Sequence, residues 1–148
     1  MDEKLMFEKK LQMFVKINQA IEGIEAIPTA EVKRLVFSDR LRRQKKRELR
    51  EKMVYSEDAR EVKEPEILRM RRILLIREIK ELGCMTCEEK HPACLEFHHE
   101  DSEAKSFSIA SHINRALTLK DLSNEINKCI LICSNCHRKE HHRQDENA

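Results

Sequence analysis

The chain has 148 residues, of which 38% are charged and 4% are aromatic, and it contains no Trp. With so few large apolar side chains, a short module within this chain is expected to need a bound metal in order to fold. No apolar run approaches the roughly 18 residues of a membrane helix, and the N-terminus lacks the pattern of a signal peptide. The sequence therefore predicts a cytoplasmic protein and excludes a membrane protein.

Charge and metal-binding residue types both divide the chain near residue 83. Residues 1–83 carry 21 Lys and Arg against 16 Asp and Glu, a net charge of +5, and contain no Cys or His. Residues 84–148 carry a net charge of −3 and hold all six Cys and all seven His. We therefore predict two domains, a helical arm at 1–83 and a compact metal-binding module at 84–148.

The arm is predicted to consist of helices. Apolar residues recur at helical spacing within residues 3–26, and Pro28 ends this segment. Residues 30–54 are helical in composition, and residues 66–82 form a third helix that Gly83 ends. The predicted fold class is therefore α+β and mainly helical.

The module is predicted to alternate short elements. Polar and apolar residues alternate at 94–98, which is typical of a strand. Residues 100–112 are polar and predicted to be a loop, and an apolar run at 130–132 leads into the second cysteine pair. Short helices are predicted at 117–127 and 136–142.

Two Cys-x-x-Cys pairs predict a structural zinc site. A spacing of two residues lets both sulfurs of a pair reach one ion, and two pairs supply the four thiolates of tetrahedral Zn²⁺. The alternatives are unrelated thiol pairs or a redox pair, but in a reducing compartment metal ligation is favoured over disulfides. Cys94 and Cys129 stand in apolar surroundings and are expected to be small core residues. The predicted zinc ligands are Cys84, Cys87, Cys133 and Cys136.

Four histidines form a second candidate metal site. His137 and His141 stand four residues apart on a predicted helix, so both imidazoles lie on one face and can share a metal. His98 on the predicted strand supplies a third neutral imidazole and leaves His99 free as a base. The alternative is a solvated helix that happens to carry histidines. Three imidazoles favour Zn, Ni or Mn by ligand type, and Mg is favoured only by its abundance.

Together these motifs resemble the HNH endonuclease family, in the zinc-braced form found in phages and bacteria. The resemblance covers about residues 80–143 and is carried by the cysteine pairs, by Leu95 to Asp101, by Lys105 and by Lys128 to His141. It implies a ββα-metal fold, in which a two-stranded hairpin packs on a helix with one divalent ion between them. In one departure, Lys128 stands where the family commonly has an Asn that supports the hairpin and orients the base.

The resemblance also assigns roles to residues. It implies that His99 is the general base and that the four paired cysteines bind structural zinc. The implied ligands of the catalytic ion are His98, His137 and His141.

The function implied is metal-dependent endonuclease cleavage of DNA. His99 would take a proton from water while one divalent ion (Mg²⁺, Mn²⁺, Ni²⁺ or Zn²⁺) stabilises the leaving 3′-oxygen. The alternatives are a non-catalytic zinc module that binds nucleic acid, and a nuclease effector subunit of a larger complex. The histidines favour the enzyme over the first alternative, because a structural zinc site needs none of them.

The second predicted helix carries a basic stretch. Between Arg40 and Lys52 there are eight Lys and Arg against two acidic residues. Such a stretch can neutralise phosphates, and the alternative is a solvated helical face. Because the module is acidic, we expect the arm to attract DNA, through Arg40, Arg42, Arg43, Lys45, Lys46 and Arg47. The apolar stripe at 5–24 is expected to pack within the arm, in a homo-oligomer or in a larger complex.

Overall fold

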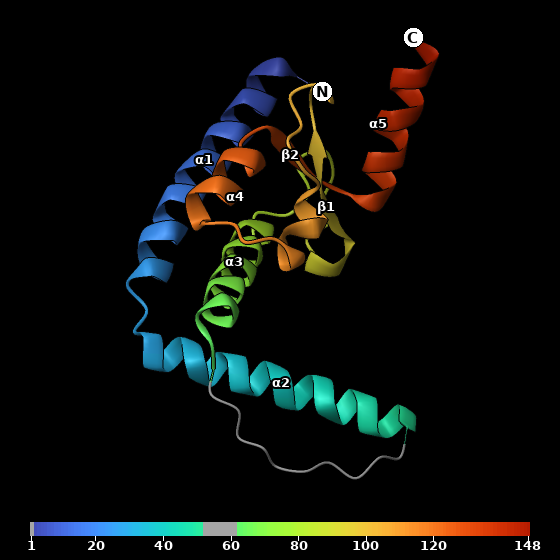
Figure 1. Ribbon diagram of the computed structural model, residues 1–148. Helices are drawn as coiled ribbons and strands as arrows, with labels where there is room; N and C mark the ends of the chain where they lie inside the picture. Colours follow the sequence, from blue (N-terminus) through green and yellow to red (C-terminus); the bar gives the residue numbers. More distant parts are fainter. Residues whose placement is uncertain (1, 52–61) are drawn as a thin grey trace.

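The computed structural model describes residues 2–51 and 62–148, which form a mainly helical α+β fold around a two-stranded antiparallel sheet (Figure 1). This is the predicted fold class. The helices of the arm are α1 (Glu3–Glu25), α2 (Thr29–Glu51) and α3 (Glu64–Lys80). The remaining elements, with η for a 3-10 helix, are η1 (Pro92–Cys94), β1 (Leu95–His99), η2 (Ile109–Asn114), α4 (Leu119–Ile126), β2 (Cys129–Cys133) and α5 (Ser134–Glu146).

Each predicted helix is present, although residues 52–54 at the predicted end of the second helix lie outside the described residues. In the module, the structure assigns a strand to one segment and corrects the prediction for another. The apolar run at 130–132 is the middle of the strand β2, which is buried along its whole length and pairs with β1. The predicted loop at 100–112 runs into η2, where the buried side chain of Ile109 joins the main core.

Local sequence signals explain where several helices begin and end. Asp2 caps α1 by accepting a hydrogen bond from the backbone N–H of Lys4 at 3.0 Å. Pro65 lies in the first turn of α3, where a backbone N–H is not needed. After α3, Gly83 has a φ of +78°, and a Cβ there would lie 3.2 Å from the carbonyl oxygen of Glu89. The turn into the first cysteine pair therefore requires glycine.

The main core joins the arm to the module. Side chains of α1, α3, α4 and both strands pack as one buried apolar cluster. Its fully buried members include Ile17 of α1, Ile79 of α3, Leu122 of α4 and Leu131 of β2. The domain boundary at residues 83 and 84 stays a prediction, but the apolar core is continuous across it.

Polar contacts also connect α1 to the rest of the molecule. Lys9 donates a hydrogen bond to the carbonyl oxygen of Met85, next to the first cysteine pair, at 2.7 Å. Lys16 forms ion pairs with Glu78 at 3.3 Å and with Glu81 at 3.2 Å. These contacts place α1 against both α3 and the turn that follows it.

The helix α2 lies across the ends of α1 and α3 (Figure 1). Its first half packs through Val32 and Val36 into a second, smaller apolar cluster with residues around the start of α3. Beyond Val36, none of the side chains described up to residue 47 is buried. The side chains of residues 37–47 on α2 therefore remain at least partly open to solvent.

The apolar stripe predicted for the first helix is divided between two faces. Phe7, Leu11 and Phe14 keep 68%, 53% and 49% of their surface exposed. The residues of α1 that are buried are Met13, Ile17, Ala20 and Ile24. In the described part of the chain, no helix has the length and apolar content that a membrane span needs.

Candidate functional site

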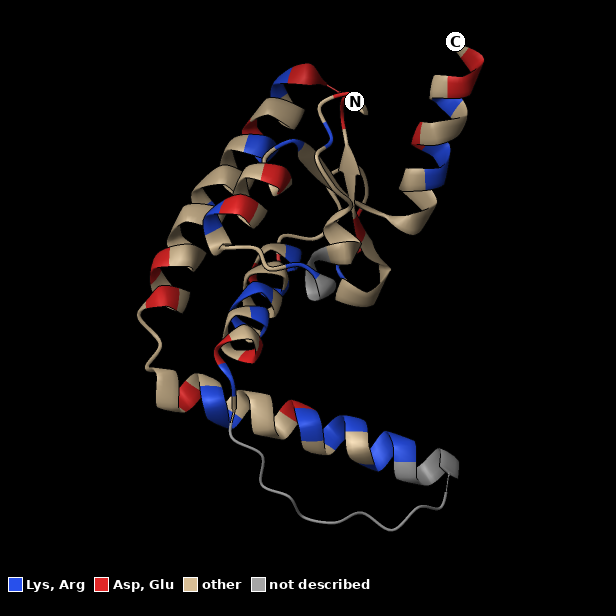
Figure 2. Ribbon diagram, viewed as in Figure 1, with Lys and Arg blue, Asp and Glu red and all other residues tan. Residues whose placement is uncertain are grey.

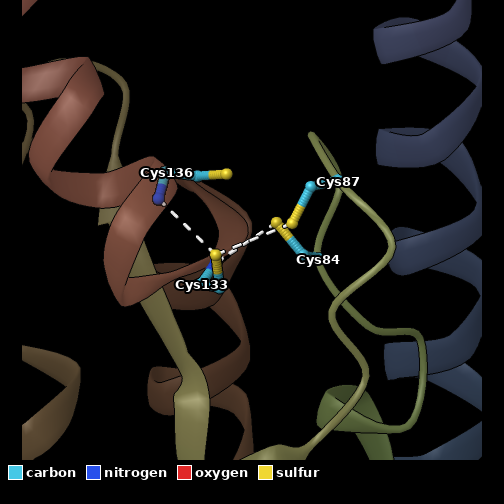
Figure 3. Close-up of side chains that lie close together, drawn as sticks. All are labelled: Cys84, Cys87, Cys133 and Cys136. Atoms are coloured by element: carbon cyan, nitrogen blue, oxygen red, sulfur yellow. Dashed lines mark hydrogen bonds between the residues drawn. The ribbon is translucent and has the colours of Figure 1, made fainter.

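The two cysteine pairs meet between the turn after α3 and the junction of β2 with α5 (Figure 3). Their four sulfur atoms lie within 4.8 Å of one another. The sulfurs of Cys87 and Cys133, one from each pair, are 3.7 Å apart. Sulfurs bound at about 2.3 Å to one tetrahedral zinc lie about 3.8 Å apart. The four cysteines therefore have the spacing to bind a metal ion such as zinc.

Hydrogen bonds to sulfur favour a thiolate at Cys84. The Sγ of Cys84 accepts hydrogen bonds from the backbone N–H of Cys133 at 3.2 Å and of Thr86 at 3.5 Å. Burial acts in the opposite direction, but hydrogen bonds from Thr86 and nearby backbone groups lower the pKa of Cys84 to about 6. A hydrogen bond from the Glu89 backbone acts to lower the pKa of Cys87, but the neighbouring sulfurs raise it to about 12. Four thiolates here need a cation to offset their repulsion.

The other two cysteines lie outside this cluster. Cys129 is completely buried in the main core, as predicted, and burial raises the pKa of its thiol to about 12. Cys94 is half-buried in η1 and is not a member of the core, so the prediction for it was wrong. Its position matters because it provides a cysteine that can be changed without touching the metal-binding pairs.

Three of the four candidate histidines converge beside the sheet. His98 lies on β1, and His137 and His141 lie on α5, with ring nitrogens within 4.8 Å of one another. The Nε2 atoms of His137 and His141 are 3.0 Å apart. Nitrogens at about 2.1 Å from one ion and at a right angle also lie about 3.0 Å apart. The structure therefore brings the three predicted ligands together at a spacing that fits one ion.

The surroundings of His98 favour its neutral ring, and a carboxylate sets the orientation of the His137 ring. His98 is only 4% exposed, and burial, together with the neighbouring charges of His137 and His141, lowers its pKa. Glu96 lies 2.5 Å from Nδ1 of His137 and accepts a hydrogen bond from Ser134 at 2.8 Å. Hydrogen bonds from His137 and Ser134 lower the pKa of Glu96. Because an ionised carboxylate can only accept, Nδ1 of His137 donates to Glu96, and Nε2 is the ring nitrogen that faces His141.

The predicted base, His99, is bound to a buried carboxylate. Its Nε2 lies 2.8 Å from Oε1 of Glu125, which is on α4 and only 2% exposed. Burial acts to raise the pKa of Glu125, but hydrogen bonds from Lys128, His99, and the backbones of Ser106 and Phe107 lower it to about 2. An ionised Glu125 can only accept, so Nε2 of His99 donates to it, and Nδ1 is the ring nitrogen that this carboxylate does not engage.

A cavity of about 750 Å³ is lined by all four histidines and by residues of α3, the loop after β1, and α5. Lys80 of α3 and Lys105 of the loop add positive charge to its walls, and Glu96, Glu100 and Asp101 add negative charge. The side-chain nitrogen of Gln144 lies 3.5 Å from Nε2 of His98. The cavity therefore adjoins both the histidine cluster and the candidate base, and a cation bound by the histidines would give it an excess of positive charge.

The six basic residues predicted to bind DNA lie on α2, at the opposite end of the molecule from α5 (Figure 2). Half of them form ion pairs within the fold. Arg40 pairs with Glu66, and Arg42 and Arg43 each pair with Asp39 at 2.8 Å. The other three are exposed and have no ion-pair partner among the described residues: Lys45, Lys46 and Arg47. The structure does not bring this stretch to the cavity.

Sequence reasoning does not identify three of the residues that shape this site. Glu125 had one usable signal, because it lies three positions before Lys128 at the end of a predicted helix, and this spacing permits a local ion pair. Glu96 shares the strand face of His98, two residues away, which also can be read from the sequence. Lys80 had no signal, because only the packing of α3 against the module brings it to the cavity.

Comparison of the chain with protein-family models, curated proteins and solved structures found no significant match. A function for this protein must therefore be argued from its own geometry. The features that carry this argument are the cysteine cluster, the histidine cluster and the cavity that contains His99.

Proposed function

We propose that this protein is a metal-dependent endonuclease of the HNH type that hydrolyses DNA phosphodiester bonds in the cavity beside β1. The observation that carries this proposal is the convergence of His98, His137 and His141, with His99 lining the same cavity. In this proposal, β1, β2 and α5 form the ββα-metal unit, and zinc at the four paired cysteines braces it.

The histidine cluster would hold the catalytic ion. Its three imidazoles suit Zn²⁺, Ni²⁺ or Mn²⁺, and Mg²⁺ is the fourth candidate because of its abundance. When bound, such an ion supplies a Lewis acid that neutralises phosphate charge and stabilises the leaving 3′-oxygen. The role of Glu96 is to fix the ring of His137 so that Nε2 faces the cluster, as carboxylates do for histidine ligands in general.

His99 acts as the general base. Its Nε2–H is held by Glu125, so Nδ1 is the ring atom that accepts a proton. A water in the cavity gives this proton to Nδ1 as its oxygen attacks phosphorus. The bond from phosphorus to the 3′-oxygen breaks, and the leaving oxygen takes a proton from solvent. The products are a 5′-phosphate and a 3′-hydroxyl, and such base catalysis contributes roughly 10²–10⁴-fold in rate.

Positive charge at two places supports DNA as the substrate. Lys80 and Lys105 line the cavity and can contact phosphates next to the scissile one. Lys45, Lys46 and Arg47 on α2 are exposed and can neutralise phosphates farther along the duplex. Because these two groups lie at different ends of the molecule, the proposal favours a substrate longer than a single nucleotide.

The histidines decide between this proposal and a non-catalytic zinc module that binds nucleic acid. Zinc held by four cysteines does not need these histidines. A module without catalytic activity also does not need a buried carboxylate beside His99. A role as the nuclease effector of a larger complex is compatible with the same chemistry. The exposed Phe7, Leu11 and Phe14 of α1 are the residues most suited to such an assembly or to a homo-oligomer.

A plasmid-nicking assay tests the proposal. The zinc-loaded full chain is supplied in turn with Mg²⁺, Mn²⁺, Ni²⁺ and Zn²⁺, and supercoiled, nicked and linear DNA are measured. We expect His99→Ala to lower the nicking rate by about 10²-fold or more, because the proton acceptor is removed. His142→Ala is the matched control, since His142 lies on α5 next to His141, is exposed, and lies outside the cluster.

Two results would overturn the proposed function. One is wild-type protein that fails to nick DNA in the presence of each of the four ions. The other is His99→Ala protein that nicks as fast as wild type and His142→Ala protein, which would place the activity elsewhere or in a contaminant.

A further inference from the structure

Glu125 is a buried acceptor at which four donors meet. Its Oε1 lies 2.8 Å from Nε2 of His99 and accepts hydrogen bonds from the backbone N–H of Ser106 at 2.8 Å and of Phe107 at 3.3 Å. Its Oε2 accepts a hydrogen bond from Nζ of Lys128 at 2.8 Å. A carboxylate that is only 2% exposed is stable as an anion only when such donors replace its water shell.

Lys128 connects this carboxylate to the loop after β1. Besides Glu125, its Nζ donates to the carbonyl oxygen of Ala104 at 2.9 Å and to Oγ of Ser106 at 2.9 Å. Its own carbonyl oxygen accepts from the backbone N–H of Glu100 at 3.2 Å, at the end of β1. Lys128 therefore fixes both ends of the segment between His99 and Phe107, which carries Lys105 into the cavity.

We propose that Glu125 and Lys128 form a positioning pair that fixes the ring of His99 and the loop beside it for proton abstraction. Glu125 holds the Nε2 side of the ring, so its orientation and its tautomer are set before substrate arrives. Lys128 neutralises Glu125 and keeps it from being drawn to any other cation. The catalytic part of this inference rests on the proposed endonuclease function, whereas the state of the His99 ring does not.

A first experiment reads the His99 ring directly, without any activity. In the zinc-loaded full chain labelled with ¹⁵N-histidine, we expect an imidazole N–H resonance that exchanges slowly with solvent and disappears in His99→Ala protein. Its nitrogen should be Nε2, and Nδ1 should be unprotonated. Glu125→Gln should weaken the protection of this proton, because a neutral amide oxygen is a poorer acceptor than a carboxylate. A His99 ring without a protected N–H in wild-type protein overturns the inference.

A second experiment separates positioning from simple structural support. For Glu125→Gln we expect kcat for DNA cleavage to fall about 10- to 100-fold with little change in KM. Ser123→Ala is the matched control, because Ser123 is 4% exposed on the same helix and its hydroxyl donates to the backbone carbonyl of Lys120. The control should keep wild-type kcat.

The double variant Glu125→Gln/Lys128→Met supplies the decisive comparison. The double variant should be more stable than Glu125→Gln protein. In the single variant the Lys128 ammonium group faces the introduced amide, and in the double variant this ammonium group is absent. The double variant should not recover kcat, because the acceptor for His99 is still neutral. Recovery of kcat together with stability would show that the pair only supports the fold, and would overturn the inference. If wild-type protein cleaves no DNA, the proposed function fails, and the N–H resonance alone decides the positioning of His99.

Discussion

Cys84 links the two halves of the candidate zinc site, because its sulfur accepts a backbone hydrogen bond from Cys133 in the other pair. We expect Cys84→Ser protein to hold about one zinc fewer per chain than wild type. Binding of structural zinc contributes roughly 10–16 kcal/mol in small zinc modules, so the region around the cysteines should also become less stable.

Metal analysis by mass spectrometry and thermal melting measure these two effects. Cys94→Ser is the matched control, because Cys94 is half-buried and lies outside the cluster. We expect the control to retain wild-type zinc content. Cys84→Ser protein with full zinc content and an unchanged melting temperature would contradict the assignment of these ligands.

At the scale of the element, α2 carries its basic residues in two groups with different surroundings. Arg42 and Arg43 are paired with Asp39, whereas Lys45, Lys46 and Arg47 have no ion-pair partner among the described residues. A cation already paired with a carboxylate must give up that interaction before it can neutralise a phosphate. We therefore expect DNA binding by this helix to depend mainly on its second, unpaired group.

Substitution of Lys45, Lys46 and Arg47 by Gln should weaken duplex binding and reduce its salt dependence. The slope of log affinity against log salt should fall by about 0.9 for each phosphate that is no longer neutralised. Fluorescence anisotropy over a salt series measures this slope. The matched control is Arg42→Gln/Arg43→Gln, which should change the slope less. Equal slopes in wild type and the triple variant would mean that this part of α2 is a solvated face.

For the whole molecule, the continuous core predicts cooperative unfolding. Ile79 of α3 is completely buried in the same cluster as Leu131 of β2, on opposite sides of the predicted domain boundary. We expect Ile79→Ala to cost about 2–5 kcal/mol and to lower the helix-melting and zinc-release temperatures together. Leu82→Ala, at a residue that is 37% exposed, is the control and should change both little.

Circular dichroism reports the helices, and a zinc-sensitive dye reports the cysteine cluster. One shared transition is the expected result. Zinc release at a temperature clearly separate from helix melting would instead support two independently folding units that meet near residue 83.

Reading the residues in order was enough to predict the helices, the two groups of candidate metal ligands and the candidate base, and the structure contains the helices and brings each group together. Helical periodicity, the Pro65 and Gly83 signals and the strand alternation are local properties, so they can be read from neighbouring residues. The same holds for the spacing of His137 and His141 on one helix face. Metal ligands are also easy to recognise, because few residue types can supply them and their spacing is restricted.

The groups that surround these candidate ligands come from distant parts of the chain and become visible only in the folded molecule. Glu125 and Lys128 lie 26 and 29 positions after His99, and their interaction with it or with its loop depends on how α4 packs against the sheet. Lys80 lines the cavity because α3 packs against the module in the shared core. The packing of α2 against α3 likewise pairs Arg40 with Glu66, whereas the pairs of Arg42 and Arg43 with Asp39 have a local helical spacing. Burial and hydrogen bonding set the charge state and orientation of a side chain, and both are properties of neighbours brought together by folding.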